Sequence, residues 1–198
     1  SGGETLRRFQ WSPGELAIVD RGYATPPGIA WVVEHGADVL VRVNRGSLPL
    51  FDRDGTRIDV LHRLRALRVN EPAEWKVQVD HVKGRKHRII KGRLVAVRLP
   101  ENKAAEARRR VHKEYGSATT EEQLEAASFV ALFTTARRAR LSTRRCLHAY
   151  RLRWQIELQF KRWKSLCGLD RLPNYRDDTI LAWLYAKVLL GLLMDRMS

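Results

Sequence analysis

The sequence predicts an α/β fold with a β-rich insertion, and three observations support this prediction. A strand, a helix and a second strand are predicted within residues 15–43. Several short segments with strand character follow, and the pattern then becomes mainly helical. We therefore expect one segment of the core at residues 1–45, an antiparallel β insertion at 46–100, and the remainder of the core at 101–198.

The first part of the chain has the pattern of a strand–helix–strand unit. Residues 15–20 (ELAIVD) form an apolar run that ends at an acid, which is typical of a buried strand. Pro26-Pro27 favours the start of a helix, the apolar spacing over 28–35 continues it, and Gly36 is a plausible end. Residues 38–43 (DVLVRV) predict a second strand, so a βαβ unit is expected.

The middle of the chain predicts antiparallel β structure. Strand-like composition occurs in six short segments: 48–51, 57–61, 64–69, 75–82, 87–90 and 94–99. Asp54-Gly55 is a hairpin signal, and Gly84 and Gly92 are expected to mark further turns.

The last part is predicted to be helical except for one buried strand at 128–134. A polar helix is expected at 103–116, and another at 119–126, where Thr120 and Gln123 have the spacing of a capping box. A long helix is predicted from Ser142 to about Leu166, with Gly168 as its end. The apolar helix at 177–197 is expected to be buried, because its apolar run is shorter than the ~20 residues of a membrane span.

Composition indicates a globular protein with a polyanionic partner. The 198 residues include 37 Lys and Arg against 22 Asp and Glu, a formal net charge of +15, and 44% are hydrophobic. Such a chain can bury a sizeable core, and its basic surface favours binding to nucleic acid. The two cysteines exclude a disulfide framework, so an intracellular, cytoplasmic protein without membrane association is expected.

The basic residues form two clusters along the chain. The larger one contains ten Lys and Arg, with Glu157 as its only acid: Arg137, Arg138, Arg140, Arg144, Arg145, Arg151, Arg153, Lys161, Arg162 and Lys164. The second cluster has two nearby histidines, His81 and His87, and six cations: Lys83, Arg85, Lys86, Arg88, Lys91 and Arg93. Either cluster alone is compatible with an ordinary solvated face, but two clusters together favour nucleic acid.

At about 100° per residue, the long helix places one carboxylate among cations. One stripe holds Tyr150, Arg153, Glu157, Lys161 and Lys164, and the adjacent apolar stripe, expected to be buried, holds Leu152, Ile156, Phe160 and Trp163. Glu157 could simply pair with Arg153 and Lys161, contributing ~0.2–0.5 kcal/mol per pair. The same stripe also suits phosphodiester chemistry, in which a carboxylate holds a divalent metal and the cations hold phosphates.

The long helix resembles a known family. The order Tyr150, Arg153, Glu157 and Lys164 matches the Y-(2)-R-(3)-E-(6)-K signature of transposases of the insertion sequence 4 family. The surrounding residues YRLRWQIELQFKRWKSLCGL, and AIVDRGYA around Asp20, are also similar to that family. The resemblance implies a ribonuclease H-like fold and a DNA transposase of the Asp-Asp-Glu type. Such an enzyme catalyses metal-dependent strand cleavage and strand transfer at the ends of insertion sequences.

The resemblance also implies roles for individual residues. Asp20 and Glu157 would be catalytic ligands of Mg²⁺ or Mn²⁺, although Asp20 alone could equally be a strand-end carboxylate that caps the following turn. Tyr150, Arg153, Lys161 and Lys164 would bind DNA. The partners would be double-stranded DNA, as transposon ends and target, and a second copy of the chain in a homodimeric complex. A bacterial cytoplasm, with association to the nucleoid, is implied as location.

The sequence departs from the family pattern in one respect. The family's first catalytic Asp lies on an earlier strand, whereas residues 1–19 contain no Asp and the chain does not begin with Met. We therefore expect an N-terminally incomplete core, the C-terminal portion of a transposase, with little or no strand-transfer activity of its own. The alternative is a non-catalytic nucleic-acid-binding remnant that uses the same basic face. An RNA-binding module is a third hypothesis, but no RRM-like or KH-like pattern supports it.

Overall fold

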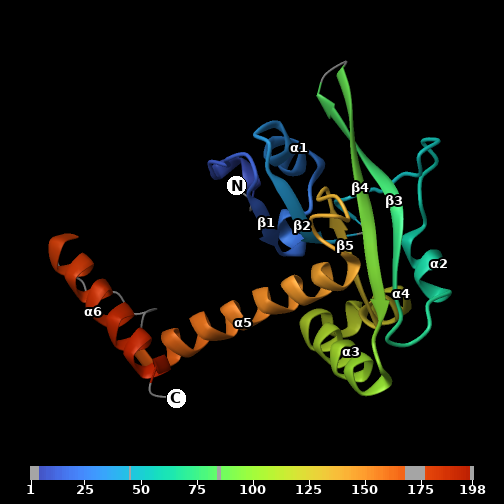
Figure 1. The fold of residues 1–198 in the computed structure, drawn as a ribbon. Coiled ribbons are helices and arrows are strands. Elements are labelled where there is room, and N and C mark those ends of the chain that lie inside the picture. The colour runs from blue at the N-terminus through green and yellow to red at the C-terminus, as the bar shows by residue number, and fades with distance from the viewer. Residues whose placement is uncertain (1–4, 45, 84–85, 168–176, 197–198) are drawn as a thin grey trace. The chain divides into compact units, whose positions relative to one another are not determined.

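The computed structural model describes residues 5–44, 46–83, 86–167 and 177–196. Five strands of this part form one sheet, in the order β1–β2–β5–β4–β3 (Figure 1). The strands are β1 (Leu16–Val19), β2 (Asp38–Arg42), β3 (Pro72–Lys83), β4 (Lys86–Arg98) and β5 (Phe129–Thr134). β1 and β2 are parallel, and all other neighbours are antiparallel. With the helices, this mixed sheet confirms the α/β prediction.

Six α-helices accompany the sheet in the described ranges. They are α1 (Pro26–Glu34), α2 (Val60–Arg65), α3 (Glu101–Tyr115), α4 (Glu121–Ala127), α5 (Thr143–Cys167) and α6 (Asp177–Arg196). Short 3-10 helices lie at η1 (Leu6–Arg8), η2 (Arg21–Tyr23) and η3 (Gly116–Ala118). The chain divides into two compact units, residues 1–150 and 151–198. None of the described helices is both long and apolar enough to cross a membrane.

The sheet of the first unit has a hydrophobic cluster on each face, because side chains alternate along its strands. The larger cluster packs α1 and α2 against the sheet and includes Ile29, Val39, Leu61, Leu94 and Phe133. The smaller cluster contains Leu40, Val95, Leu132, Ala136, Leu141 and Cys146. Cys146 belongs to α5, so the second face of the sheet is covered by the first turns of that helix.

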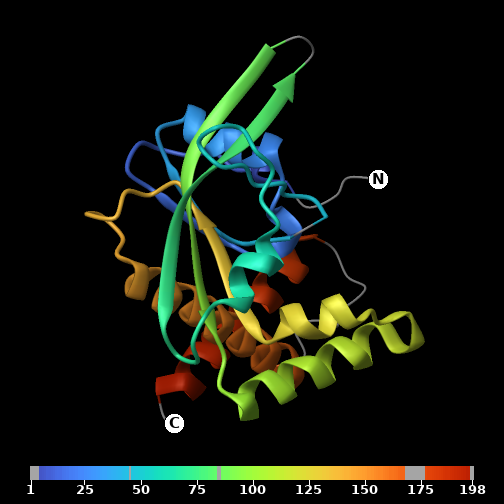
Figure 2. The same cartoon turned by 90° about the vertical axis from the view of Figure 1, so that its right-hand side faces the viewer.

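β3 and β4 form one continuous hairpin, where the sequence predicts three separate segments. Their register runs from the pair Pro72–Val97 to the pair Lys83–Lys86. β4 also pairs with β5, from Arg93–Thr134 to Arg98–Phe129. The outer part of the hairpin therefore extends past the rest of the sheet, as Figures 1 and 2 show. The division of the chain at residues 46 and 100 stays a prediction, although these strands share a sheet with β1 and β2.

The turn predicted at Gly92 is wrong, because Gly92 lies in the middle of β4. A Cβ atom built there would lie 2.5 Å from two ring carbons of Phe133 and 2.7 Å from the carbonyl oxygen of Thr134. Glycine is therefore needed for the close approach of β4 to β5 and not for a turn. Gly84 lies outside the described residues.

The β segments predicted at 57–61 and 64–69 are also wrong, because α2 occupies residues 60–65 and only isolated β-bridges at Arg57 and Val69 remain around it. The Asp59 side chain accepts hydrogen bonds from the backbone N–H groups of Leu61 and His62, at 3.0 and 3.2 Å. This N-cap satisfies donors that a helix start leaves open. The apolar residues then bury one helical face through Val60, Leu61 and Leu64.

Other local predictions are confirmed. Thr120 and Gln123 form the capping box of α4, with reciprocal bonds of 3.0 and 3.2 Å. Gly55 has φ +89° in the turn that follows Asp52, whose N–H bonds the Thr56 carbonyl at 2.8 Å. α3 and α4 begin and end close to the predicted residues and lie side by side (Figure 2).

The burial predicted for two apolar helical stripes is wrong. On α5, Leu152 is 43% and Ile156 is 58% exposed, and on α6 Tyr185 is 69% exposed. Periodicity shows which residues share a face, but burial requires another element to pack on that face. The side chains of Phe160 and Trp163, and the predicted helix end at Gly168, lie outside the described residues.

Candidate active site

Asp20 stands at the carboxyl end of β1, where the chain turns into η2. Its Oδ1 accepts a hydrogen bond from the backbone N–H of Arg21 at 2.7 Å, and Asp20 is the N-cap residue of η2. The alternative foreseen for Asp20, a strand-end carboxylate that caps a turn, is therefore realised. This role fixes the position of the carboxylate at the edge of the sheet and does not exclude a second role.

Tyr150 brings α5 to this carboxylate. Its hydroxyl donates to Oδ1 of Asp20 at 3.1 Å, across 130 positions of the sequence. The Tyr150 ring packs at the border of the smaller hydrophobic cluster, beside Leu147 and Ala149. The contact lies within the first compact unit, so two of the residues singled out in the sequence meet in the fold.

Arg21 connects the same strand end to α3. Its guanidinium donates to Glu114 at 2.6 Å and to the hydroxyl oxygen of Tyr115 at 3.3 Å. Burial lowers the pKa of Arg21, but Glu114, Tyr115 and Asp20 outweigh that effect and raise it above its ordinary value. Arg21 thus stays a fixed positive charge beside Asp20.

The other predicted site residues lie farther along α5, in the second compact unit. Arg153 forms an i,i+4 ion pair with Glu157, as the simpler interpretation of this stripe predicts. Lys161 lies over the ring of Trp154, with Nζ 5.5 Å from the centroid, in a cation–π contact. Lys164 is exposed. The convergence of Asp20 and Glu157 on one metal stays a prediction.

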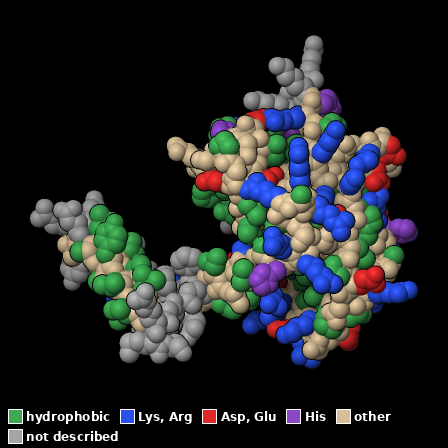
Figure 3. All heavy atoms as spheres, viewed as in Figure 1, with side chains coloured by type: hydrophobic (Ala, Val, Ile, Leu, Met, Phe, Trp, Pro, Cys, Tyr) green, Lys and Arg blue, Asp and Glu red, His purple; other side chains and the backbone are tan. Residues whose placement is uncertain are grey.

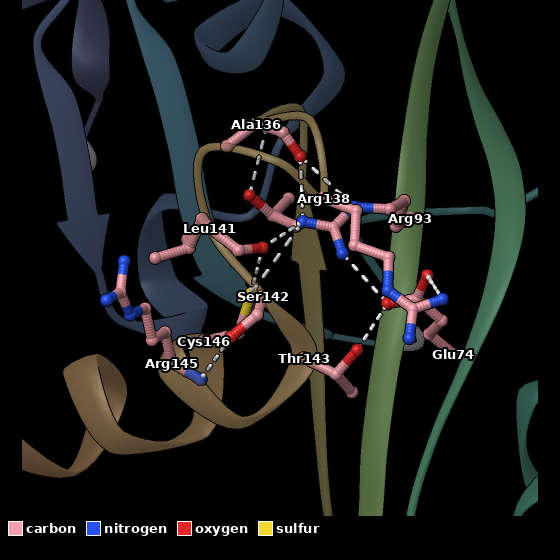
Figure 4. A network of polar contacts seen from close by, with 10 residues as sticks. Glu74, Arg93, Ala136, Arg138, Leu141, Ser142, Thr143, Arg145 and Cys146 are labelled. Carbon is pink, nitrogen blue, oxygen red and sulfur yellow. Dashed lines mark hydrogen bonds and ion pairs between the residues drawn. The ribbon is translucent and has the colours of Figure 1, made fainter.

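A buried polar network holds the start of α5 against the hairpin (Figure 4). Arg93 of β4 donates to Glu74 of β3 at 2.8 Å and to the carbonyl oxygens of Ala136 and Leu141 at 2.8 and 2.6 Å. Thr143, the first residue of α5, also donates to Glu74. The network therefore ties two strands, the loop at 135–142 and α5 together.

The Glu74 carboxylate of this network is stabilised by two arginines and a hydroxyl group. Burial alone raises the pKa of Glu74, but the hydrogen bond from Thr143 and the charges of Arg93 and Arg138 outweigh it and hold this pKa below its ordinary value. Arg138 contributes an ion pair of 3.6 Å. Burial raises the pKa of the neighbouring Cys146 thiol, which therefore stays protonated at neutral pH.

Sequence reasoning missed Glu74 and treated Arg93 only as part of a basic cluster. The available signal is the alternation of β3 and β4, in which Glu74 and Arg93 share a face with Val95. That face is covered by α5, so these two charged side chains need each other as partners. Which face would be covered depends on packing between distant segments.

The chain is similar to known transposases along nearly all of its length. The family model described as "Transposase DDE domain" matches residues 2–193 of the chain. The transposase for insertion sequence element IS421 of Escherichia coli is 35% identical over 197 residues, 97% of this chain and 53% of the relative. The transposase for insertion sequence element IS231F of Bacillus thuringiensis subsp. israelensis is 26% identical over 204 residues, 94% of this chain and 41% of the relative.

The matches cover nearly all of this chain but only part of each relative. The chain spans about half the length of the curated relatives it matches, and nearly all of the chain is included. The family model likewise covers the strand end at Asp20 and the whole of α5. The chain therefore belongs to the DDE transposase family.

Proposed function

We propose that this chain is the catalytic portion of a transposase of the insertion sequence 4 type, with a ribonuclease H-like core. The activity proposed for the whole transposase is metal-dependent cleavage and strand transfer of DNA at the ends of an insertion sequence, to which this chain would contribute Asp20 and Glu157. The observation that carries the proposal is the 3.1 Å hydrogen bond from Tyr150 to Asp20. It joins Tyr150, the first residue of the Y-R-E-K signature on α5, to Asp20, the acidic residue of the segment AIVDRGYA at the end of β1.

The residues fit a divalent metal. Carboxylate oxygens are the ligands that Mg²⁺ and Mn²⁺ prefer, and Asp20 and Glu157 supply them in this proposal. The described residues contain no group of three or more Asp, Glu, His or Cys that could hold a metal. Two carboxylates suffice for Mg²⁺ in many phosphoryl-transfer sites, because substrate phosphates and water complete its octahedron. The two hydrogen bonds to Asp20 Oδ1 would orient this ligand.

The chain's own residues then act on the DNA. A divalent cation, when bound, supplies Lewis-acid activation of the attacking oxygen and neutralises charge on the phosphate. Asp20 and Glu157 hold that cation, and Tyr150 keeps the Asp20 carboxylate oriented. Arg153, Lys161 and Lys164 offer positive charge to the phosphates beside the scissile bond, where Arg153 can bind in bidentate fashion.

The partners follow from this activity. Double-stranded DNA, as transposon ends and target, is the substrate, and its phosphates match the net charge of +15. A homodimer on DNA would bring two ends together for joining. The proposed location is the cytoplasm of a bacterium, in association with the nucleoid.

Metal binding by the purified chain tests the proposal without a known terminal sequence. Mn²⁺ titration followed by electron paramagnetic resonance should show a site that Asp20→Asn and Glu157→Gln each weaken by about tenfold or more. Glu157 is a half-buried helix residue in an i,i+4 pair, so its substitution should change the unfolding free energy by only ~0.5 kcal/mol.

The chain offers a matched control for each variant. Asp59 is also an N-cap aspartate, and Glu106 is also a glutamate in an i,i+4 pair, with Arg110. Asp59→Asn and Glu106→Gln should leave Mn²⁺ affinity unchanged. Equal affinity in the wild type and in both site variants would contradict the metal role of Asp20 and Glu157. DNA binding that persists under that outcome would favour the non-catalytic alternative.

A further inference from the structure

A cationic pocket lies on the hairpin, apart from the residues proposed for catalysis. Its volume is about 430 Å³, and it is lined by Arg53, Lys76, Val77, Gln78, Lys91 and Gly92. Lys91 is the cross-strand partner of Gln78, and Lys76 is the partner of Arg93. Side-chain alternation places Lys76, Gln78 and Lys91 on one face, opposite the face that buries Val77.

Arg53 reaches this pocket from a separate loop. Phe51 bonds both backbone groups of Gln78, at 2.8 and 2.9 Å, so the chain at 51 runs beside β3. The turn at Gly55 then reverses the chain, and Arg53 lies between these two points. Three cations from three segments are thus held together by backbone pairing.

The charges of these three residues are available for a ligand. Arg53, Lys76 and Lys91 are exposed, and none makes an ion pair with another residue in the described ranges. Among the nearby carboxylates, Asp54 accepts a hydrogen bond from the backbone N–H of Thr56 at 2.9 Å. Asp52 pairs with Arg63 and Glu74 with Arg93, while Asp80 contacts the imidazole of His87, which is a cation only when protonated. In the described ranges, these three cations are therefore not held in ion pairs within the fold.

The pocket continues a larger basic surface of the first unit. Arg138 of the loop that leads into α5 is 73% exposed and pairs with Glu74, which shares a face of β3 with Lys76. Arg93, across from Lys76, is buried and does not add to this surface. In Figure 3, Lys and Arg side chains gather over the region of the hairpin and the adjacent sheet. A run of separated cations on one face suits a polymer with regularly spaced negative charges.

We propose that Arg53, Lys76 and Lys91 bind a backbone phosphate of double-stranded DNA, as a contact additional to the residues of α5. The proposal rests on the proposed function in taking DNA as the ligand. Lys and Arg bind phosphate through charge and hydrogen bonds, and the Gln78 amide adds a further donor. No base edge is read by such a contact, so the pocket supplies affinity and orientation without sequence preference.

The test is salt-dependent binding of a short DNA duplex of arbitrary sequence, measured by fluorescence anisotropy in EDTA. Replacing Arg53, Lys76 and Lys91 with Gln should lower affinity roughly tenfold at about 50 mM salt and reduce the slope of log K against log salt by about 1. The matched control replaces Arg109, Lys103 and Lys113 of α3 with Gln, which removes the same number of Arg and Lys charges.

Each outcome bears on the proposal. A loss in the pocket variant that clearly exceeds the loss in the α3 control supports it. Equal losses of affinity in both variants would assign the effect to net charge and overturn the proposal. A pocket variant with an unchanged slope of log K against log salt and an unchanged melting temperature would overturn it as well. Stronger competition by duplex RNA than by duplex DNA would also overturn it. Because EDTA removes divalent metal, this measurement of DNA affinity does not depend on whether Asp20 and Glu157 form a metal site.

Discussion

Arg93 Nη1 lies 2.8 Å from Glu74 Oε2, and the two side chains are only 9% and 19% exposed. This ion pair joins the two strands of the hairpin on the face that α5 covers. Because Arg93 also donates to two carbonyl oxygens of the loop at 135–142, the pair fixes where α5 begins. The position of Tyr150 against Asp20 depends on that start.

Replacing Arg93 with Met should destabilise the protein by on the order of 3 kcal/mol, because two buried carbonyl groups lose their guanidinium donor and Glu74 loses its buried cationic partner. The free energy of unfolding, measured by urea titration, tests this value. Arg65 offers a control, since it makes a two-bond pair with Glu125 but is 54% exposed. Arg65→Met should cost clearly less than Arg93→Met, because water screens an exposed ion pair. Similar losses in both variants would contradict the buried role of Arg93.

The Glu74 carboxylate should make stability depend on pH. Its pKa is held below the ordinary value in the folded state. The stabilisation is therefore fully present above the ordinary glutamate pKa and is lost as pH falls through the lowered one. Glu74→Gln should be less stable than wild type at pH 7, and the difference should narrow below about pH 4. Thermal melts across this range measure it, and a constant difference would refute the assignment.

Tyr150→Phe should separate orientation of Asp20 from simple packing. The variant keeps the ring but loses the donor, so the unfolding free energy should fall by about 1 kcal/mol. If Asp20 holds a metal, Mn²⁺ affinity should also fall by about tenfold, as expected when a ligand loses an orienting bond. Tyr115→Phe is the control, because the Tyr115 hydroxyl accepts from Arg21 and has no role in the proposed site. A Tyr150→Phe variant with unchanged Mn²⁺ affinity would show that the contact is structural only.

Gly92→Ala should disturb the junction of β4 and β5. The added methyl group would meet both the Phe133 ring and the Thr134 carbonyl oxygen, and the backbone oxygen has no room to move within the ladder. We expect a loss of about 1–3 kcal/mol in unfolding free energy. Gly46→Ala provides a comparison, because its nearest neighbour is a side-chain oxygen at 3.6 Å. An unchanged unfolding free energy in Gly92→Ala would mean that the two strands can move apart without cost.

Local features were predictable because their causes lie within a few residues. The capping box of α4 and the turn at Gly55 follow from neighbouring side chains and backbone preferences. The same local reasoning failed at 60–65, where strand-like residues belong to a helix that Asp59 caps. It failed again at Gly92, where the reason for glycine is Phe133, 41 positions later.

The sequence by itself determined the βαβ unit, the basic charge, and the stripe on α5 with Glu157 among cations. These depend on composition and on the periods of strand and helix, which a linear chain displays directly. Only the tertiary structure decided that the hairpin joins β5 in one sheet, that Tyr150 meets Asp20, and that Arg93 and Glu74 are buried together. Such contacts depend on which surfaces pack against each other across long separations, and no local period encodes that choice.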